Sequence, residues 1–231
     1  MSVSAQTGPS TRTKATAGTG TARTRAAGTA ATTGQRGGYA KGRATQQEII
    51  RTAILVFADV GFHGASLRDI AARVGISHPG LLHHFPNKAA LLEAVLEYRD
   101  AVDEQSFQED LERGSDYFEA LLNVVERNRL RRPLVELFAG LSTEATSPDH
   151  PAHDYFQRRY ARVLGEQSQL LRERAARGGL APGVDPDQAA RTVVALMDGL
   201  QIQWLLSLER PGAQRVDMAA DLRGYLDLIL R

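Results

Sequence analysis

The side chains best suited to bind nucleic acid gather between Arg68 and Lys88. Imidazole can donate to or accept from a base edge, and basic side chains contact phosphates. His78 begins a short segment with helical periodicity, so we expect it to reach a base, although it could instead be only an exposed turn residue. We expect His83, His84 and Lys88 to reach phosphates. The candidate DNA contacts are Arg68, Ser77, His78, Pro79, Gly80, Leu82, His83, His84 and Lys88.

Two groups of histidines could suggest a metal site. His83 and His84 are adjacent, and neighbouring side chains on a helix point about 100° apart, so they cannot chelate one ion. The segment DHPAHD, residues 149–154, offers two imidazoles and two carboxylates, which suit a divalent transition metal. It equally suits a polar loop before a helix, with Asp154 in the first turn, and nothing distant completes a ligand set. We therefore expect no metal site and no cofactor.

Motifs for catalysis are missing from the sequence. We find no GxSxG, HExxH or Walker motif, and GTGTAR at 18–23 lacks a third glycine and a following helix. The chain contains no cysteine, which excludes disulfides, thiolate metal sites and cysteine nucleophiles. No run approaches the ~18 apolar residues of a membrane span, and no secretory signal is evident. We expect a cytoplasmic protein that is not an enzyme and does not enter the membrane.

Aromatic side chains with a few polar neighbours recur in the C-terminal part. Such a combination is typical of small-molecule pockets. Each residue could equally belong to the core, but together they predict a site for a mainly apolar ligand with one or two hydrogen-bonding groups. The candidate ligand contacts are Tyr117, Phe118, Phe138, Tyr155, Phe156, Tyr160, Met197, Gln201 and Trp204.

The DNA-contact candidates require a pair of short helices to position them. In residues 66–88, SLRDIAARVGISHPGLLHHFPNK, Ser66 and Asp69 form a capping-box pattern that predicts a helix over Leu67–Val74. Gly75 is expected to end this helix and turn the chain. The pattern predicts a helix-turn-helix whose second helix lies in the major groove of DNA, although a plain helical hairpin carries the same signals.

The second helix of this pair has its own start signals. Ser77 can cap it, and Pro79 is tolerated in its first turn, where a missing N–H costs nothing. Leu81 and Phe85 repeat at a helical spacing of four. Near the start of the first helix, Arg68 is placed for a phosphate, although an acidic neighbour could hold it instead.

Residues 45–92 resemble the DNA-binding domain of the bacterial tetracycline-repressor (TetR) family. The matching segments are IIRTAILVFADVGFHGASLRDIAARVGIS and HHFPNKAALL, and the rest of the chain matches only in its helical rhythm. The family usually has Thr and Tyr where this chain has Gly80 and Leu82, which puts the phosphate contact at position 82 in doubt. The resemblance implies a dimeric repressor that binds a pseudo-palindromic operator and is released by a small-molecule effector.

Composition divides the chain into three parts. Residues 1–44 are rich in Thr, Ala and Gly, and the first 40 carry five basic and no acidic side chains. We expect a disordered tail there, either adding phosphate contacts or serving only as a solvated extension. Residues 45–92 form the DNA-binding domain. Residues 93–231 form a helical effector-binding and dimerisation domain, which is acidic overall and unsuited to nucleic acid.

Helical patterns account for everything after residue 44. In the DNA-binding domain, Thr45 with Glu48 predicts the start of a helix that ends at Gly61. Asn87 is expected to cap a long helix, which in the resembling family connects the two domains and sets the separation of the recognition helices. Further helices are predicted over residues 115–130, 133–146, 152–177, 185–208 and 216–229, and we find no strand pattern.

The last two predicted helices are the most apolar. Their apolar residues cover more of the circumference than a surface helix needs, which predicts burial against a partner. Gly199 and Ala220 are small enough to let two helices approach closely. A monomer core would give the same pattern, but the TetR resemblance favours a homodimer through these two helices.

The sequence therefore predicts an all-α, ligand-responsive transcriptional regulator with a DNA operator and a small-molecule effector as partners. One alternative is an all-helical carrier or enzyme, which would show no sequence-specific DNA binding. Another is a DNA-organising protein without an effector, which would show weak sequence preference and no release by ligand.

Overall fold

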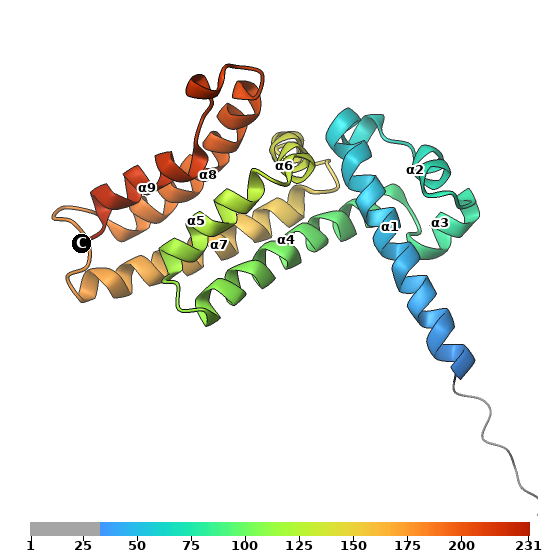
Figure 1. Ribbon diagram of the computed structural model, residues 1–231, viewed down its shortest axis with the longest axis horizontal. Coiled ribbons are helices and arrows are strands. Elements are labelled where there is room, and N and C mark those ends of the chain that lie inside the picture. Colours follow the sequence, from blue (N-terminus) through green and yellow to red (C-terminus); the bar gives the residue numbers. More distant parts are fainter. Residues whose placement is uncertain (1–32) are drawn as a thin grey trace, which may run out of the picture. The chain divides into compact units, whose positions relative to one another are not determined.

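The computed structural model describes residues 33–231, with side chains from Gly42 onward except Ala213 (Figure 1). The chain divides into two units, Met1–Tyr39 and Ala40–Arg231, and the second contains almost all of the described residues. Most of the predicted tail, residues 1–32, lies outside the described residues. Within them the regular structure is helical, and strand-like pairing is limited to one isolated bridge between Leu180 and Leu230, which confirms the all-α prediction.

Helix α1 spans Thr33–Gly64, so the predicted helix start at Thr45 is wrong, and residues 33–44 are helical where disorder was expected. Arg43 and Ala44 favour helix, and no proline interrupts the segment, so the helix continues upstream of Thr45. Thr45 is thus an interior residue and cannot be the N-cap. The predicted end is confirmed, because Gly61 has φ 68 and breaks the helical geometry there.

The next three helices follow closely on one another. They are α2 (Leu67–Val74), α3 (His78–His84) and α4 (Lys88–Glu112). Asn87 caps α4 as predicted, with its side chain accepting a hydrogen bond from the Ala90 N–H at 2.8 Å. The apolar face of α1 lies beneath α2 and α3 and contributes Ile50, Ala53, Ile54 and Phe57, all of them buried, to a shared core.

Five further α-helices complete the C-terminal part. They are α5 (Tyr117–Asn128), α6 (Arg132–Glu144), α7 (His153–Ala176), α8 (Pro186–Ser207) and α9 (Met218–Ile229), with a short 3₁₀ helix, η1 (Gly212–Gln214), before α9. Each predicted helix of this part is found, with its ends shifted by at most two residues. Aspartates cap three of them, because the carboxylates of Asp116, Asp185 and Asp217 accept N–H bonds from the first turn.

Two hydrophobic cores support these helices. The first joins α1–α4 to the end of α6 and the start of α7, and it contains Phe57, Leu81, Leu96, Leu141 and Phe156. The second lies among α5, α8 and α9. Helix α4 begins in the first core and continues alongside α5, so it is shared by the N-terminal helices and the C-terminal bundle (Figure 1).

Candidate DNA-binding helices and effector cavity

The turn between α2 and α3 has the predicted geometry. Gly75 adopts φ 77, a left-handed conformation that favours glycine, and its N–H bonds back to the Ala72 carbonyl at 3.1 Å. The Ser77 hydroxyl caps α3 by accepting the Gly80 N–H at 3.1 Å. A Cβ at position 80 would lie only 3.2 Å from the Ser77 oxygen, so the glycine leaves room for this cap.

The capping box predicted for α2 is wrong, although the helix bounds are confirmed. Within the described residues the Ser66 side chain makes no capping bond. The Asp69 carboxylate instead pairs with Arg73, one turn along α2, at 3.0 Å. An i,i+4 ion pair on the helix surface therefore takes the carboxylate away from the N-terminus. Arg68 stays exposed and forms no ion pair with any described residue, so it is available to a phosphate.

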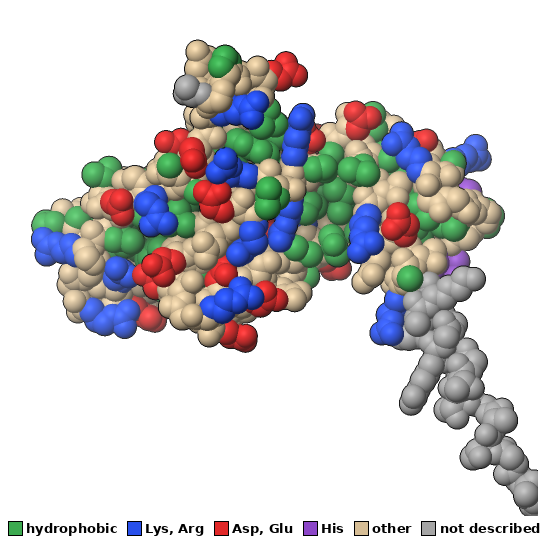
Figure 2. All heavy atoms as spheres, viewed as in Figure 1, with side chains coloured by type: hydrophobic (Ala, Val, Ile, Leu, Met, Phe, Trp, Pro, Cys, Tyr) green, Lys and Arg blue, Asp and Glu red, His purple; other side chains and the backbone are tan. Residues whose placement is uncertain are grey.

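Helix α3 is held from below and presents its other side to solvent. Leu81 and Phe85 are buried in the first core together with Ile70 of α2. The predicted contacts Ser77, Pro79 and His83 are exposed, whereas His78, Gly80, Leu82 and His84 are half-buried. The histidine side chains visible in Figure 2 lie along this α3 edge. The structure thus leaves Ser77, Pro79 and His83 accessible, and only partly exposes the other candidates of α3.

Lys88 has intramolecular partners that sequence reasoning missed. Its ammonium donates to the Ala65 carbonyl at 2.9 Å and to the His63 carbonyl at 3.3 Å. It also lies 4.5 Å from the centroid of the Phe62 ring, a cation–π geometry. These contacts tie the start of α4 to the segment between α1 and α2. A phosphate contact of Lys88 stays a prediction.

A cavity of about 740 Å³ lies among α4, α5, α7 and α8. Its volume falls within the range of small-molecule sites, about 300–1,000 Å³. Five of the predicted ligand contacts line it: Tyr117, Phe138, Tyr160, Met197 and Gln201. Sequence reasoning missed the charged side chains that share this lining, because acidic and basic residues of amphipathic helices normally face solvent.

The other predicted ligand contacts lie outside this cavity. Phe118 and Trp204 pack in the second core, and Phe156 packs in the first, all three almost fully buried. Their large apolar surfaces are covered by other core side chains. Tyr155 instead donates its hydroxyl to the Asp100 carboxylate at 2.7 Å and borders a smaller cavity between the starts of α4 and α7.

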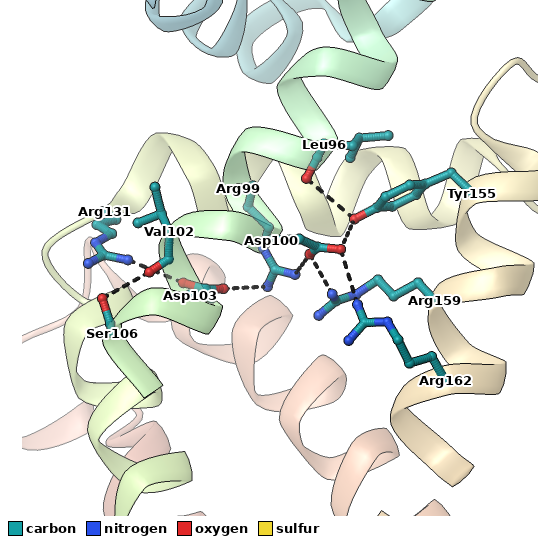
Figure 3. Close-up of polar contacts among 10 residues, drawn as sticks. All are labelled: Leu96, Arg99, Asp100, Val102, Asp103, Ser106, Arg131, Tyr155, Arg159 and Arg162. Atoms are coloured by element: carbon teal, nitrogen blue, oxygen red, sulfur yellow. Dashed lines mark hydrogen bonds and ion pairs between the residues drawn. The ribbon is translucent and has the colours of Figure 1, made fainter. Parts of the chain in front are cut away.

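A network of charges joins α4 to α7 along the cavity (Figure 3). Its centre is the Asp100 carboxylate, which accepts from Arg159 at short range and lies 3.5 Å from the Arg162 guanidinium, both on α7. Arg99 lies 3.2 Å from the same carboxylate. With the hydroxyl of Tyr155, Asp100 is thus surrounded by donors, three of which come from α7.

A second carboxylate extends this network toward α6. Asp103 lies 3.4 Å from Arg99 and 3.2 Å from Arg131. The Arg99 guanidinium also stacks 4.1 Å from the Phe138 ring centroid and is 8% exposed. A buried guanidinium needs such partners, since an uncompensated buried charge is costly.

Next to this network, the cavity lining combines aromatic rings with carboxylates. The rings of Phe107 and Tyr117 lie 5.1 Å apart, edge to face. Burial, and then the Glu166 carboxylate, raises the pKa of Tyr117 to about 12, so this phenol stays neutral. Glu104 and Glu166 line the mouth, and the buried Oε1 of Gln167 accepts no hydrogen bond from any described residue.

One further acid faces the cavity from α8. The Tyr160 hydroxyl donates to Asp198 at 2.8 Å. Burial raises the pKa of Asp198, opposed by the Tyr160 hydrogen bond and by nearby arginines. Each cavity arginine already has a carboxylate partner, whereas Glu104 accepts a hydrogen bond from the neutral Gln108 amide at 2.8 Å and has no cationic partner among the described residues. The lining therefore has more capacity for a cation than for an anion.

The histidines of the DHPAHD segment are divided between two environments. His153 Nδ1 lies 2.8 Å from the Ala145 carbonyl, whereas His150 meets Glu144 and His63 with potential ligand atoms within 4.8 Å. His150 Nδ1 accepts the Ala152 N–H, so the neutral imidazole carries its proton on Nε2, 3.3 Å from the Glu144 carboxylate. Metal-bound imidazoles usually donate through their second nitrogen, which this hydrogen bond prevents. The geometry favours a His150–Glu144 pair.

Exposed apolar side chains gather on the last two helices. On α8, Ile202 is 45% and Leu206 is 74% exposed; on α9, Leu228 is 74% exposed. Gly199 of α8 and Gly224 of α9 continue these faces, and a Cβ at either position would meet no atom within 4 Å. The faces are therefore smooth and apolar, unlike the mixed acidic and basic surface seen over α5 and α7 in Figure 2. Among the described helices, none is long and apolar enough to cross a membrane.

Comparison with protein families gives two matches along the chain. Residues 49–95 match the bacterial regulatory proteins of the tetR family, and residues 112–231 match the C-terminal region of BetI-type transcriptional repressors. The first match covers the helix pair and the start of α4. The second covers α5–α9, of which α5–α8 contribute to the cavity, and more than half of the chain.

Individual relatives agree with these matches. The transcriptional repressor KstR2 of Mycolicibacterium smegmatis is 26% identical over 157 residues, 64% of this chain and 73% of that protein. The class C tetracycline repressor protein of Escherichia coli is 44% identical over 52 residues, 22% of this chain and only 24% of the repressor. A transcriptional regulator from Saccharomonospora viridis, solved in complex with choline, aligns with a TM-score of 0.68 and 25% identity over 82% of this chain and 99% of the regulator.

Proposed function

This chain belongs to the tetR family of bacterial regulatory proteins, and from that premise we propose that it is a transcriptional repressor released from its operator by a small-molecule effector. The observation that carries the proposal is the double role of α4. In its first turns, Leu91, Leu92, Val95 and Leu96 are buried in the core that supports α2 and α3. Its later turns, residues 99–111, line the cavity. A ligand that shifts α4 therefore acts on the DNA-binding helices directly.

We propose that α3 enters the major groove, where His78 contacts a base edge. The exposed end of α3 faces the sugar–phosphate backbone of the DNA. The exposed positions of Ser77, Pro79 and His83 support this docking, whereas His78 and Gly80 are half-buried. Partial burial of Leu82 and His84 would limit their contacts with the DNA backbone. Arg68 supplies phosphate binding from α2 because it is exposed and has no described ion-pair partner.

We propose that the protein is a homodimer joined through α8 and α9. Exposed Ile202, Leu206 and Leu228 would be costly to leave in water, and the neighbouring glycines allow close helix packing. A twofold axis would present two α3 helices to half-sites about 34 to 36 Å apart. Sedimentation of the chain and of Leu206→Glu tests this; a monomeric wild type, or a dimer undisturbed by Leu206→Glu, would contradict the interface.

We propose a cytoplasmic protein of three parts, in which the first 44 residues are a tail, residues 45–92 bind DNA and residues 93–231 bind effector and partner. The cavity is lined by residues of α4–α8, all after residue 92, which supports the boundary between the last two parts.

The effector that fits the cavity is a small molecule with an apolar body and a cationic group. The rings of Phe107 and Tyr117 can hold a cation against their faces, and Glu104 and Glu166 compensate its charge. The free Oε1 of Gln167 can accept a hydroxyl of the ligand. Choline combines these groups, and a regulator with 25% identity to this chain was solved with choline bound.

Calorimetric titration with choline and with its neutral carbon isostere, 3,3-dimethyl-1-butanol, tests the effector class. We expect choline to bind and the isostere to bind at least tenfold more weakly, a difference of about 1.4 kcal/mol, the scale of a cation–π contact with charge compensation. Glu104→Gln should weaken choline binding, whereas Glu97→Gln, on the exposed side of the same helix, should not. Equal binding of the two ligands would exclude a cationic effector.

Operator binding is tested by a bandshift on the DNA upstream of the protein's own gene, with scrambled DNA as competitor. His78→Ala should relax base preference, narrowing the affinity ratio between operator and scrambled DNA by roughly 1–3 kcal/mol. Ligand binding without sequence-specific DNA binding would support a carrier or enzyme instead. Sequence preference that no ligand alters would support a DNA-organising protein.

A further inference from the structure

The carboxylate of Asp100 occupies an unusual position among the charged groups of α4. Three donors of α7, from Tyr155, Arg159 and Arg162, converge on it (Figure 3). Helix α4 has another buried aspartate with two arginine partners, Asp110, but those arginines lie beyond the end of α4 and on α5. Asp100 is therefore the acidic group that fixes α4 against α7.

The same contacts lie on the wall of the effector cavity. Asp100, Arg159 and Arg162 all line it, and the Arg162 guanidinium reaches from Asp100 to within 3.9 Å of Glu166 at the mouth. The Arg162 side chain is 47% exposed, so it can move into solvent at little cost. A cationic group that enters the cavity competes with these arginines for the same carboxylates.

We propose that Asp100 is the positioning residue through which the effector reaches the DNA-binding helices. Paired with the α7 arginines, it holds α4 in the arrangement that binds the operator. A cationic effector bound beside Glu104 and Glu166 displaces Arg162, which lies between Glu166 and Asp100, and so loosens α4 from α7. This inference rests on the proposed function. The two arrangements exclude each other because the effector and Arg162 compete for the same carboxylates, which is the differential contact that a ligand-driven shift requires.

Asp100 lies close to the first core, which supports the DNA-binding helices, so a change at Asp100 can reach them. Leu96, one turn before Asp100, is buried in the core that supports α3, and its carbonyl lies 3.5 Å from the Tyr155 hydroxyl. A shift of α4 against α7 at Asp100 therefore moves side chains that pack beneath the recognition helix. Packed cores transmit such shifts because they have little free volume.

Distance measurements between spin labels test the proposal without operator or effector. The chain has no cysteine, so His83→Cys on α3 and Gln169→Cys on α7 place two labels selectively, both at exposed positions. Labelled chain diluted with unlabelled chain reports distances within one protomer. We expect Asp100→Asn to change the distance distribution. Asp110→Asn, which also removes an α4 carboxylate from two arginines, should leave it unchanged.

Operator affinity provides the second readout, measured on the unlabelled chain without effector. Asp100→Asn should weaken it at least fivefold, the lower end of typical allosteric couplings, and Arg159→Gln should act in the same direction. Should Asp100→Asn fail to fold, Arg159→Gln carries the test, since it leaves Asp100 with two other arginines. Distance distributions for both variants that match those of Asp110→Asn would overturn the proposal. A wild type that binds no specific DNA would instead refute the proposed function.

Discussion

Replacement of Lys88 by Met separates two roles that one side chain could have. In the folded chain the ammonium donates to the carbonyls of Ala65 and His63 and lies over the Phe62 ring. Hydrogen bonds to a charged group contribute about 1.5–3 kcal/mol each, and an exposed cation–π contact about 0.5–1 kcal/mol. Because Lys88 is only half-buried and Met keeps the apolar stem, we expect Lys88→Met to cost about 2–3 kcal/mol.

Urea unfolding followed by helical circular dichroism measures this loss. Arg68→Met is the matched control, since it removes an exposed cation of α2 with no described ion-pair partner, and it should change stability by less than about 0.5 kcal/mol. A Lys88→Met chain as stable as the control would refute the intramolecular role. The phosphate contact predicted for Lys88 is then tested separately by the salt dependence of operator binding.

Two further predictions concern charged groups of α2 and α4. Arg68→Ala should weaken operator binding similarly across sequences and lower the slope of log affinity against log salt by about two per dimer, since each phosphate contact contributes about 0.9; an unchanged slope would remove Arg68 from the interface. The Arg127 hydrogen bond to Asp110 lowers the pKa of that carboxyl in the folded chain. The ionised Asp110 carboxylate therefore stabilises the fold fully above about pH 4, the pKa of an aspartate in the unfolded chain. This stabilisation is lost as the pH falls through the lowered pKa of the folded state. The difference in unfolding free energy between wild type and Asp110→Asn should therefore shrink on acidification; a difference constant from pH 7 to pH 3 would contradict that origin.

The helices were predictable because their signals are local. Ser77, Asn87 and Gly75 act on backbone groups within a few residues, and the structure gives each the expected hydrogen bonds or conformation. The capping box predicted at Ser66 does not form because the Asp69 carboxylate pairs with Arg73, one turn along α2. The predicted start of α1 at Thr45 was wrong because a capping pattern marks a helix start only where the preceding residues are not already helical.

The cavity was only partly predictable, because its composition depends on which helix faces meet. Aromatic side chains were recognised by type, but type does not separate Tyr117 and Tyr160, which line the cavity, from Phe156 and Trp204, which fill the cores. The charged lining gave no signal, since Asp100 and Arg159 are 59 residues apart in sequence. Their spacing within each helix is that of ordinary surface charges.

The same limit applies to His150. In sequence the DHPAHD segment has no distant residue to complete a metal site, yet folding brings His63 and Glu144 beside it. The hydrogen bond from the Ala152 N–H, which fixes the imidazole tautomer, decides against ligation and is visible only in three dimensions.

The affinity of the operator with and without saturating choline, measured by fluorescence anisotropy on one preparation of the purified protein, tests the coupling between cavity and DNA-binding helices most directly. Through α4, choline should weaken operator binding between about 5- and 150-fold, a coupling of roughly 1–3 kcal/mol, and operator should weaken choline binding by the same factor. Calorimetry establishes in parallel whether choline occupies the cavity. Choline that binds while operator affinity stays unchanged would contradict the proposed coupling, and choline that does not bind would contradict the cationic effector.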